Sequence, residues 1–217
     1  MNRDKPIANH RNDYTKMHLD KENIDSDPIK QFQQWLNDAM QTDMQEPNAM
    51  NLATVSDDHT VSSRTVLLKG LDDRGFVFFT NYESKKSRDL ESTRQAALCF
   101  WWPKLERQVR VEGSISRVSA QESDDYYHSR PRGSQIGAHA SPQSQVLTSY
   151  DELQQRVDAL EQQFSDAEEI PRPEYWGGYR VTPKVIEFWQ GRPSRLHDRI
   201  RFRLDSENRW IIERLAP

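Results

Sequence analysis

The spacing of apolar residues changes along the chain from a helical period to a strict alternation. After Asp27-Pro28, apolar residues recur at three- and four-residue intervals, at Ile29, Phe32, Leu36, Ala39 and Met40. An aspartate followed by proline is typical of an N-cap and the first helical position. The pattern therefore predicts a helix from Pro28 to about Met44, whose apolar stripe packs against the rest of the protein.

From residue 49 onward, apolar and polar residues alternate in short runs that are separated by turn residues. The runs cover residues 50–55, 61–69, 76–80, 96–102 and 109–118, and a period of two predicts β-strands. Connections this short exclude parallel neighbours, because a parallel return needs a dozen or more residues. We therefore expect antiparallel strands in a small barrel or a strongly twisted sheet.

The second half of the chain adds helices and further strands. Short helices are predicted after Ser84 and over residues 120–129, and a capping box at Ser149-x-x-Glu152 starts another that reaches Phe164. Residues 130–148 are rich in Ser, Gln, Gly and Pro and are predicted to form a loop. Four more strands are predicted at 175–181, 185–190, 196–204 and 210–215. The expected fold class is mainly β with flanking helices, an antiparallel α+β protein.

Composition changes this picture mainly at the N-terminus. A chain of 217 residues suits one domain. Residues 1–27 are polar and lack a sustained period, so we expect a mobile N-terminal arm or lid, followed by a single domain over residues 28–217. Hydrophobic residues make up only 35% of the chain, and the mean hydropathy is −0.96. These low values favour either a polar tail or a core that a partner chain completes.

Charge, cysteine content and missing motifs argue against several classes of protein. A net charge of −4 and a pI of about 5.9 disfavour a general nucleic-acid-binding protein. A single cysteine, Cys99, excludes an internal disulfide, and no signal peptide or membrane-spanning run is seen, so a cytoplasmic protein is expected. Glycine-rich nucleotide-binding motifs are absent. H-E-x-x-H is absent too, and the histidines at 10, 18, 59, 128 and 139 lack ligand spacing, so no metal site is expected.

Cationic residues gather on one predicted strand near the C-terminus. The alternate positions hold Arg195, His197, Arg199, Arg201 and Arg203, opposed by a single acidic residue. Two like charges about 4 Å apart repel by roughly 4 kcal/mol at an effective dielectric of about 20, so a bound phosphate is the economical explanation. For Arg201 and Arg203 we favour a solvated outer face. For Arg195, His197 and Arg199 we favour a site, in which the cationic neighbours keep the imidazole neutral.

Three further groups could bind phosphate, although each is also compatible with ordinary surface charge. Arg64 and Lys69 terminate one predicted strand, and their five-position separation places them on opposite faces, where each could meet a different anion. Ser84-Lys85-Lys86 opens a helix, whose free N–H groups and positive dipole end attract phosphate. The third group, whose donors suit a phosphate monoester, comprises Tyr126, Arg130 and Ser134.

Several motifs, in their order along the chain, resemble the pyridoxine/pyridoxamine 5'-phosphate oxidase family from about residue 11 to residue 217. They are Arg64-Thr-Val-Leu-Leu-Lys69, Leu105-Glu-Arg-Gln-Val109, Tyr127-His-Ser-Arg-Pro-Arg132, Ser134-Gln-Ile-Gly137, Tyr175-Trp-Gly-Gly-Tyr-Arg180, Ile186-Glu-Phe-Trp-Gln-Gly191, Arg195-Leu-His-Asp-Arg199 and Arg214-Leu-Ala-Pro217. The resemblance implies a split β-barrel FMN-binding fold and a homodimer that holds FMN at the subunit interface.

The resemblance also implies the site residues. The implied flavin contacts are Arg64, Thr65, Val66, Leu67, Leu68, Lys69, Phe79, Thr80, Lys85, Lys86, Gln108, Gln143, Ser144, Trp189 and Arg199. The implied substrate contacts are Arg11 and Tyr14 in an N-terminal lid, then Lys69, Tyr126, Arg130, Ser134, Arg195, Leu196 and His197, of which Arg195 and His197 are the expected catalytic residues. This sequence departs from the family at Lys85-Lys86, where Arg-Lys is common, and at Phe79, where Tyr is common. Lysine at 85 lacks the guanidinium fork, which bears on flavin affinity rather than on the type of reaction.

The implied reaction is oxidation of pyridoxine or pyridoxamine 5'-phosphate to pyridoxal 5'-phosphate, with dioxygen as acceptor and hydrogen peroxide as product. The flavin would carry out the redox step. Three alternatives stay open: another split-barrel flavoprotein such as a flavin reductase, a non-catalytic binder of flavin or pyridoxal phosphate, and a small barrel that binds single-stranded nucleic acid through Trp101, Trp102 and the arginine face. A pocket for a phosphate monoester counts against the last, because a base-stacking surface has no use for one.

Overall fold

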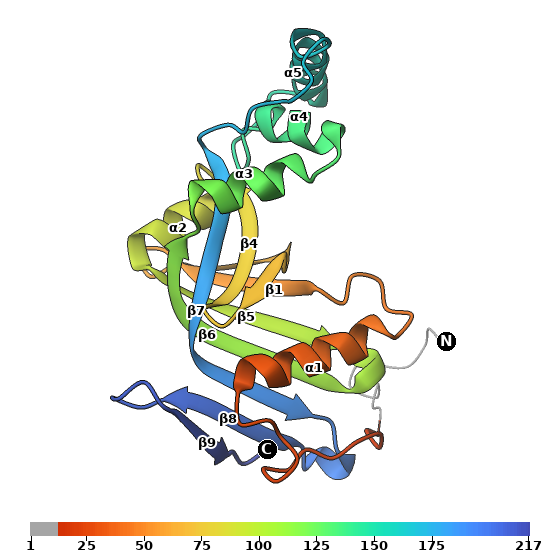
Figure 1. The fold of residues 1–217 in the computed structure, drawn as a ribbon, viewed down its shortest axis with the longest axis vertical. Helices are drawn as coiled ribbons and strands as arrows, with labels where there is room; N and C mark the ends of the chain where they lie inside the picture. Colours follow the sequence, from red (N-terminus) through yellow and green to blue (C-terminus); the bar gives the residue numbers. More distant parts are fainter. Residues whose placement is uncertain (1–12) are drawn as a thin grey trace. The chain divides into compact units, whose positions relative to one another are not determined.

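The computed structural model describes residues 13–217, which form β-strands with flanking helices (Figure 1). The strands are β1 (Ala49–Val55), β2 (Val61–Leu67), β3 (Gly70–Asp72), β4 (Gly75–Asn81), β5 (Gln95–Trp102), β6 (Arg107–Arg117), β7 (Trp176–Gln190), β8 (Asp198–Leu204) and β9 (Trp210–Arg214). The α-helices are α1 (Pro28–Met40), α2 (Lys85–Thr93), α3 (Ala120–His128), α4 (Arg132–Ala140) and α5 (Tyr150–Gln163). The fold class is therefore the predicted one, mainly β with flanking helices.

The strands are hydrogen-bonded in the order β2-β1-β5-β6-β7-β4-β3, and β8 pairs with both β7 and β9. The pairs β1–β2, β3–β4, β4–β7, β7–β8 and β8–β9 are antiparallel, as expected from the short connections. The described residues divide into two compact units. Unit 1 comprises residues 13–47, 99–111 and 184–217, and unit 2 comprises residues 48–98 and 112–183.

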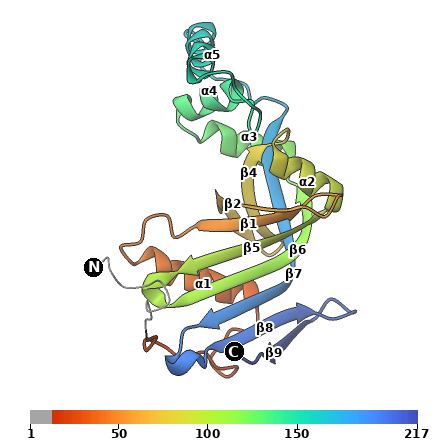
Figure 2. The same cartoon turned by 180° about the vertical axis from the view of Figure 1, so that it is seen from behind.

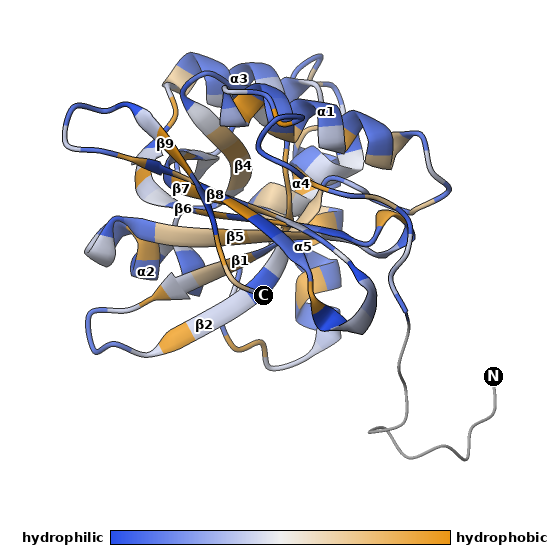
Figure 3. Cartoon of the chain, turned by 90° about the horizontal axis from the view of Figure 1, so that it is seen from below, coloured by the Kyte–Doolittle hydropathy of each residue, from blue (hydrophilic) through white to orange (hydrophobic). Residues whose placement is uncertain are grey.

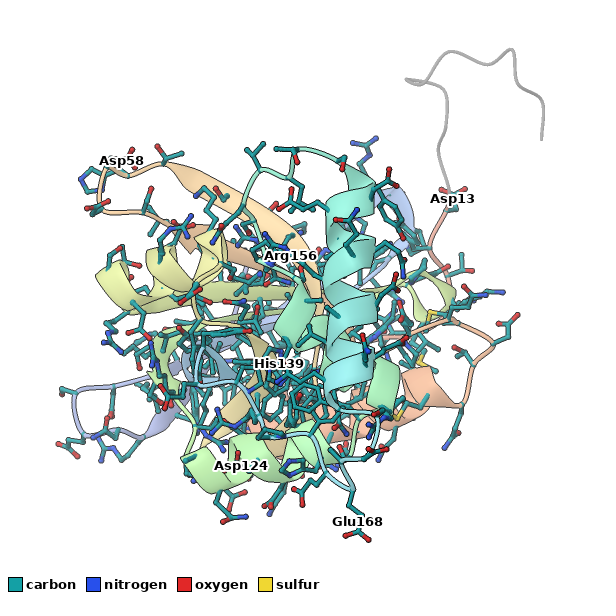
Figure 4. All side chains as sticks on the ribbon, turned by 90° about the horizontal axis from the view of Figure 1, so that it is seen from above. Asp13, Asp58, Asp124, His139, Arg156 and Glu168 are labelled. Atoms are coloured by element: carbon teal, nitrogen blue, oxygen red, sulfur yellow. The ribbon has the colours of Figure 1, made fainter. Side chains whose placement is uncertain are left out.

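Unit 2 contains two hairpins that position polar side chains. In the β1–β2 hairpin, Leu52 lies opposite Arg64, and Asp58 lies in the connecting turn (Figure 4). The β3–β4 turn requires a glycine at position 75, because its φ is +129° and a Cβ there would lie 2.1 Å from the carbonyl oxygen of Val181. Strand β4 is almost entirely buried and is coloured as hydrophobic in Figure 3.

The three later helices of unit 2 follow one another closely in space. Helix α3 begins with a complete capping box between Ser119 and Glu122. Helices α4 and α5 lie side by side (Figures 1 and 2), and the ring centroid of His139 is 5.4 Å from that of Phe164. Ser149 caps α5 as predicted, since its side chain accepts a hydrogen bond from the Glu152 N–H.

Unit 1 is built around an aromatic core beneath α1. Asp27 caps this helix and Pro28 occupies its first position, as the sequence predicted. The Phe32 ring lies 4.7 Å from the Phe100 ring, and the Trp35 ring lies 5.2 Å from the Phe188 ring, both edge-on. Burying an aromatic or aliphatic side chain of this size stabilises a fold by about 1.5–3 kcal/mol. The α1 stripe is therefore packing, as expected, except for Met40, which is exposed.

Part of the predicted N-terminal arm is described. Leu19 and Ile24 are buried, and the Leu19 N–H donates to Asp198 Oδ2 at 3.1 Å. Residues 13–27 thus contact the rest of unit 1 through both apolar and polar groups. The mobility of residues 1–27 and the single domain over 28–217 stay predictions.

Several predicted boundaries were wrong. Helix α1 ends at Met40 rather than Met44. The strand predicted to reach residue 69 ends at Leu67, and the strands predicted at 175–181 and 185–190 are one continuous strand, β7. The last cationic strand begins at Asp198, because a single 3-10 turn occupies Pro193–Arg195.

The largest error concerns residues 130–148, which were predicted to be a loop. They contain α4, whose N-cap is Pro131. A proline ends the preceding helix, yet its fixed φ also suits the start of the next one. Ile136 and Ala140 are buried on the inner face of α4, so the segment carries its own apolar stripe.

Candidate functional site: a cation-lined pocket in unit 2

A cavity of about 760 Å³ lies within unit 2. This volume falls in the range of roughly 300–1,000 Å³ that is typical of small-molecule sites. Most of the predicted flavin and substrate contacts line it: Arg64, Thr65, Val66, Leu67, Lys69, Phe79, Thr80, Lys85, Lys86, Tyr126, Arg130, Ser134, Gln143 and Ser144. The structure therefore brings together residues that are as far apart in sequence as β2 and the segment after α4.

The sequence analysis missed five lining residues, and one of its predicted contacts in unit 2 does not line the cavity. The missed residues are Asn81, Gly137, Ala138, Ser141 and Trp176. Two of them, Gly137 and Trp176, lie inside quoted motifs, which was the available signal. Leu68, a predicted flavin contact, is buried and is not among the lining residues.

Lys86 is the most buried cation of the pocket. Its ammonium donates to Gln143 Oε1 at 2.7 Å, to Thr80 Oγ1 at 3.1 Å and to Ser84 Oγ at 3.2 Å, all neutral acceptors. Burial, with an added contribution from the Arg64 charge, lowers the pKa of Lys86 to about 8. An anion in the pocket would therefore stabilise the charged form of Lys86.

A buried hydrogen-bond chain connects two other cations of the pocket. Arg64 NH1 donates to Thr54 Oγ1 at 2.8 Å, and the Thr54 hydroxyl in turn donates to Asp89 Oδ2 at 2.8 Å. Lys85 lies 3.0 Å from the same carboxylate oxygen. Arg64 and Lys85 thus share one buried carboxylate. The group formed by Arg64, Lys85 and Lys86, here called the α2 cluster, keeps an excess of positive charge.

The start of α2 adds to this positive field. The helix begins at Lys85, as expected, but its N-cap Ser84 makes no side-chain capping bond. The first N–H groups and the positive end of the helix dipole therefore remain available to an anion. Because Lys85 already pairs with Asp89, Lys86 and Arg64 are the cations of the α2 cluster better placed to meet a ligand.

Parallel aromatic rings form a second part of the wall. The Phe79 ring is stacked on Tyr126 at 4.0 Å and on Trp176 at 5.6 Å. The Arg130 guanidinium carbon lies 4.6 Å from the centroid of the Trp176 ring. Arg130 NH1 is buried and has no hydrogen-bond partner, which costs free energy unless a ligand supplies an acceptor.

Lys69 lines the same cavity as Arg64, so the prediction that they serve opposite faces was wrong. The alternation fails because β2 ends at Leu67, and the Lys69 N–H already bonds to Val77 O of β4. Within residues 13–217, none of Arg64, Lys69, Lys86 and Arg130 forms an ion pair with a carboxylate. The pocket therefore concentrates positive charge that its own side chains do not neutralise.

The remaining predicted site residues that are described lie in unit 1, and three of them form an aromatic group. The His197 ring lies 4.6 Å from the Trp189 ring, and Tyr14 contacts both rings edge-on. Gly191 admits Tyr14 here, because a Cβ at that position would lie 2.7 Å from Tyr14 Cγ. His197 Nδ1 accepts the Arg192 N–H at 3.1 Å. Burial, and then the Arg195 charge, lower the pKa of His197, so the imidazole is neutral at pH 7, as predicted.

The other unit 1 residues are more exposed. Arg195 has a left-handed backbone with φ 62°, and Leu196 is exposed. Gln108 is half-buried on β6. Arg11 lies outside the described residues.

The cationic strand does not need a phosphate, in contrast to the expectation. Glu187 binds the Arg199 guanidinium through both carboxylate oxygens, at 2.8 and 3.1 Å. Glu213 pairs with both Arg201 and Arg203. The countercharges come from neighbouring strands, so they were invisible in the local sequence. The solvated-face interpretation of Arg201 and Arg203 fits their partial exposure.

Neither a metal-binding cluster nor a membrane-spanning helix is found among residues 13–217. No group of three or more His, Cys, Asp or Glu side chains is arranged to hold a metal ion in this part of the chain. Over the same residues, no helix combines the length and the apolar character needed to cross a membrane.

Known proteins of similar length resemble this chain throughout. The pyridoxine/pyridoxamine 5'-phosphate oxidase of Salinibacter ruber is 52% identical over 212 residues, covering 97% of this chain and 99% of that one. The protein of the same name from Acaryochloris marina is 55% identical over 211 residues, covering 97% and 95%.

Solved structures share the fold. PhzG from Burkholderia lata, determined in complex with tetrahydrophenazine-1-carboxylic acid, has a TM-score of 0.88 and 30% identity, covering 95% of this chain and 100% of that one. A pyridoxamine 5'-phosphate oxidase-related, FMN-binding protein from Nostoc punctiforme has a TM-score of 0.68 at 15% identity, covering 86% and 95%, a likeness of fold alone. The class of protein is therefore a split-barrel oxidoreductase.

Two family models match the chain and make the class more specific. One, described as pyridoxamine 5'-phosphate oxidase, covers residues 36–164, and the other, described as the pyridoxine 5'-phosphate oxidase C-terminal dimerisation region, covers residues 176–217. The chain belongs to the pyridoxamine 5'-phosphate oxidase family. The dimerisation region supports a homodimer.

Proposed function

We propose that the protein is an FMN-dependent oxidase that converts pyridoxine 5'-phosphate or pyridoxamine 5'-phosphate to pyridoxal 5'-phosphate, with dioxygen as acceptor and hydrogen peroxide as product. The observation that carries the proposal is the buried, unpartnered Arg130 NH1 in a pocket where Arg64, Lys69 and Lys86 also form no ion pair with a carboxylate of residues 13–217. Phosphate groups supply the missing acceptors. Relatives that are more than half identical bear the corresponding name.

The α2 cluster fits the phosphate of FMN. Lys86 and Arg64 offer positive charge, the first turn of α2 offers N–H groups, and Thr80 and Gln143 offer neutral polar groups beside them. The family and an FMN-binding structural neighbour also suggest a flavin. We propose that the expected flavin contacts that line this pocket bind FMN here. Gln108, Trp189 and Arg199 of unit 1 stay flavin contacts proposed from the resemblance.

The aromatic part of the pocket fits the phosphate of the substrate. Lys69, Arg130, Ser134 and Tyr126 all line it. Arg can engage two phosphate oxygens at once, and the stacked rings beside it suit a planar pyridine. Two anion-binding groups in one cavity match two phosphorylated ring systems that bind together.

Bound FMN would supply the redox chemistry, taking a hydride from C4' of the substrate and passing the electrons on to dioxygen. Arg195 is proposed to hold the substrate ring and to assist the departing proton. His197, neutral at pH 7, is proposed to help orient the ring, with Tyr14 and Arg11 closing over it. The flavin is proposed to lie at the interface of the homodimer.

Substrate comparison tests this proposal. Purified protein, supplied with FMN and dioxygen, should form hydrogen peroxide and pyridoxal 5'-phosphate with either B6 phosphate. Activity only with NADPH and free flavin would instead indicate a flavin reductase. Turnover only of a reduced phenazine carboxylic acid would indicate a function like that suggested by the ligand of PhzG, and binding without turnover would indicate a non-catalytic binder.

A further inference from the structure

Arg130 has a fixed backbone and a side chain that one aromatic face supports. Its N–H donates to Tyr127 O at 3.2 Å, and its carbonyl accepts Gln135 Nε2 at 2.8 Å. The guanidinium carbon lies 4.6 Å from the centroid of the Trp176 ring and 5.8 Å from that of Tyr127. No carboxylate among residues 13–217 forms an ion pair with Arg130. The ring of Trp176 is thus the principal group that holds this side chain.

Trp176 is itself held in a single orientation. It is 6% exposed and is stacked nearly parallel to Phe79 and Tyr126, with interplanar angles of 12° and 10°. Its N–H donates to Pro173 O at 3.0 Å, and its carbonyl accepts Arg172 NH1 at 2.6 Å. A ring whose orientation its neighbours fix can in turn fix a guanidinium that lies over its face.

A guanidinium that stacks on a ring keeps its in-plane N–H groups free for an anion. In Arg130 one such group, NH1, is buried without any acceptor. In an arginine held by a carboxylate, these N–H groups would donate to that carboxylate instead. An aromatic support therefore holds the side chain without competing with a bound phosphate.

We propose that Trp176 is a positioning residue for substrate specificity: its ring holds the Arg130 guanidinium so that NH1 is presented to the phosphate of the B6 substrate. This inference rests on the proposed function. Trp176 acts through Arg130, so its loss weakens binding of phosphorylated B6 compounds and leaves binding of their non-phosphorylated forms unchanged.

Calorimetric titration of the FMN-loaded protein with 4-deoxypyridoxine 5'-phosphate tests the inference. This probe has no aldehyde that could react with lysine and no C4' substituent to oxidise, so it reports binding alone. We expect W176L to bind the probe about tenfold more weakly than the unmodified protein, and W176F to be intermediate, because a smaller ring supports a cation less well. The affinity for 4-deoxypyridoxine, which lacks the phosphate, should be the same in all three proteins.

A double-mutant cycle with R130Q separates positioning from direct contact or general support. In the R130Q background, W176L should cause no further loss of affinity for the phosphorylated probe. An additive loss, or an equal loss for both probes, would overturn the inference. Circular dichroism checks folding, and if W176L does not fold, W176F and W176Y supply the same comparison.

The outcomes also separate this inference from the proposed function. If the unmodified protein binds 4-deoxypyridoxine 5'-phosphate no more tightly than 4-deoxypyridoxine, the phosphate site is wrong and both proposals fail. If it prefers the phosphorylated probe and W176L shows the same preference, only the role of Trp176 is overturned.

Discussion

The ammonium of Lys86 lies 2.7 Å from Oε1 of Gln143, so a nearly buried charge is met by a neutral amide. No carboxylate of residues 13–217 pairs with this lysine. The charge of Lys86 is therefore available to a ligand, and the ligand-binding properties of the pocket should depend on its protonation.

FMN affinity should fall as the pH rises through about 8, the pKa of Lys86 in the ligand-free protein. The phosphate of FMN favours the charged form of Lys86, so the pKa of Lys86 is higher in the FMN complex than in the free protein. Above pH 8, FMN binding must therefore include uptake of a proton by Lys86. The expected loss approaches about tenfold per pH unit. Quenching of flavin fluorescence measures the FMN affinity from about pH 6.5 to about pH 9.5. This range lies above the second pKa of the phosphate, about 6, so the charge of the ligand stays constant.

Riboflavin, which lacks the phosphate, is the control ligand for this titration, and K86M is the control variant. Both should give affinities that change little across the same window. A pH dependence in K86M equal to that of the unmodified protein would show that another group titrates.

Replacing Thr54 by valine should weaken FMN binding about tenfold. Valine keeps the volume but removes the hydroxyl that links Arg64 to Asp89, and a hydrogen bond to a charged group contributes about 1.5–3 kcal/mol. Parallel titrations with FMN and riboflavin measure the effect, and T54S, which keeps the hydroxyl, is the matched control. Equal weakening for FMN and riboflavin would contradict a role directed at the phosphate.

Replacing Arg195 by methionine should lower kcat by about a hundredfold or more while changing the FMN dissociation constant little. The expected loss follows from the proposed role of Arg195 in proton transfer, since such catalysis contributes roughly 10²–10⁴-fold. Steady-state oxygen consumption and flavin titration on the same preparation measure the two quantities. Unchanged turnover in R195M would remove Arg195 from the mechanism.

FMN should stabilise the homodimer if it lies at the subunit interface. A ligand that binds the dimer better than the monomer shifts the association equilibrium by mass action. Sedimentation at decreasing protein concentration, with and without FMN, should show dissociation at a lower concentration when FMN is present. An equilibrium that FMN leaves unchanged would place the flavin away from the interface.

The local elements of the fold could be predicted because their signals are local. Asp27-Pro28 and Ser149-x-x-Glu152 start helices where the capping rules place them. Helix α4 could not, because the Pro131 that ends one helix also begins the next. The end of β2 at Leu67 could not be predicted from the sequence pattern either. The sequence therefore did not show that Arg64 and Lys69 line the same cavity.

Site residues that lie in sequence motifs could be predicted, but the charge balance of the site could not. Glu187 and Glu213 neutralise arginines on a neighbouring strand, which come near them only once the strands pair. Asp89 reaches Arg64 through Thr54, a connection that depends on the register of β1 and β2. Trp176 was quoted within a motif, yet its place beside Arg130 needed the fold to bring β7 and the end of α3 together.

The most direct test of the proposed function is the visible spectrum of the purified, FMN-loaded protein when pyridoxamine 5'-phosphate is added without oxygen. The proposal predicts that the flavin absorbance bleaches, that pyridoxal 5'-phosphate appears in equal amount, and that admitting air restores the spectrum with release of hydrogen peroxide. A flavin spectrum that stays unchanged with both B6 phosphates, in protein shown to bind them, would contradict it.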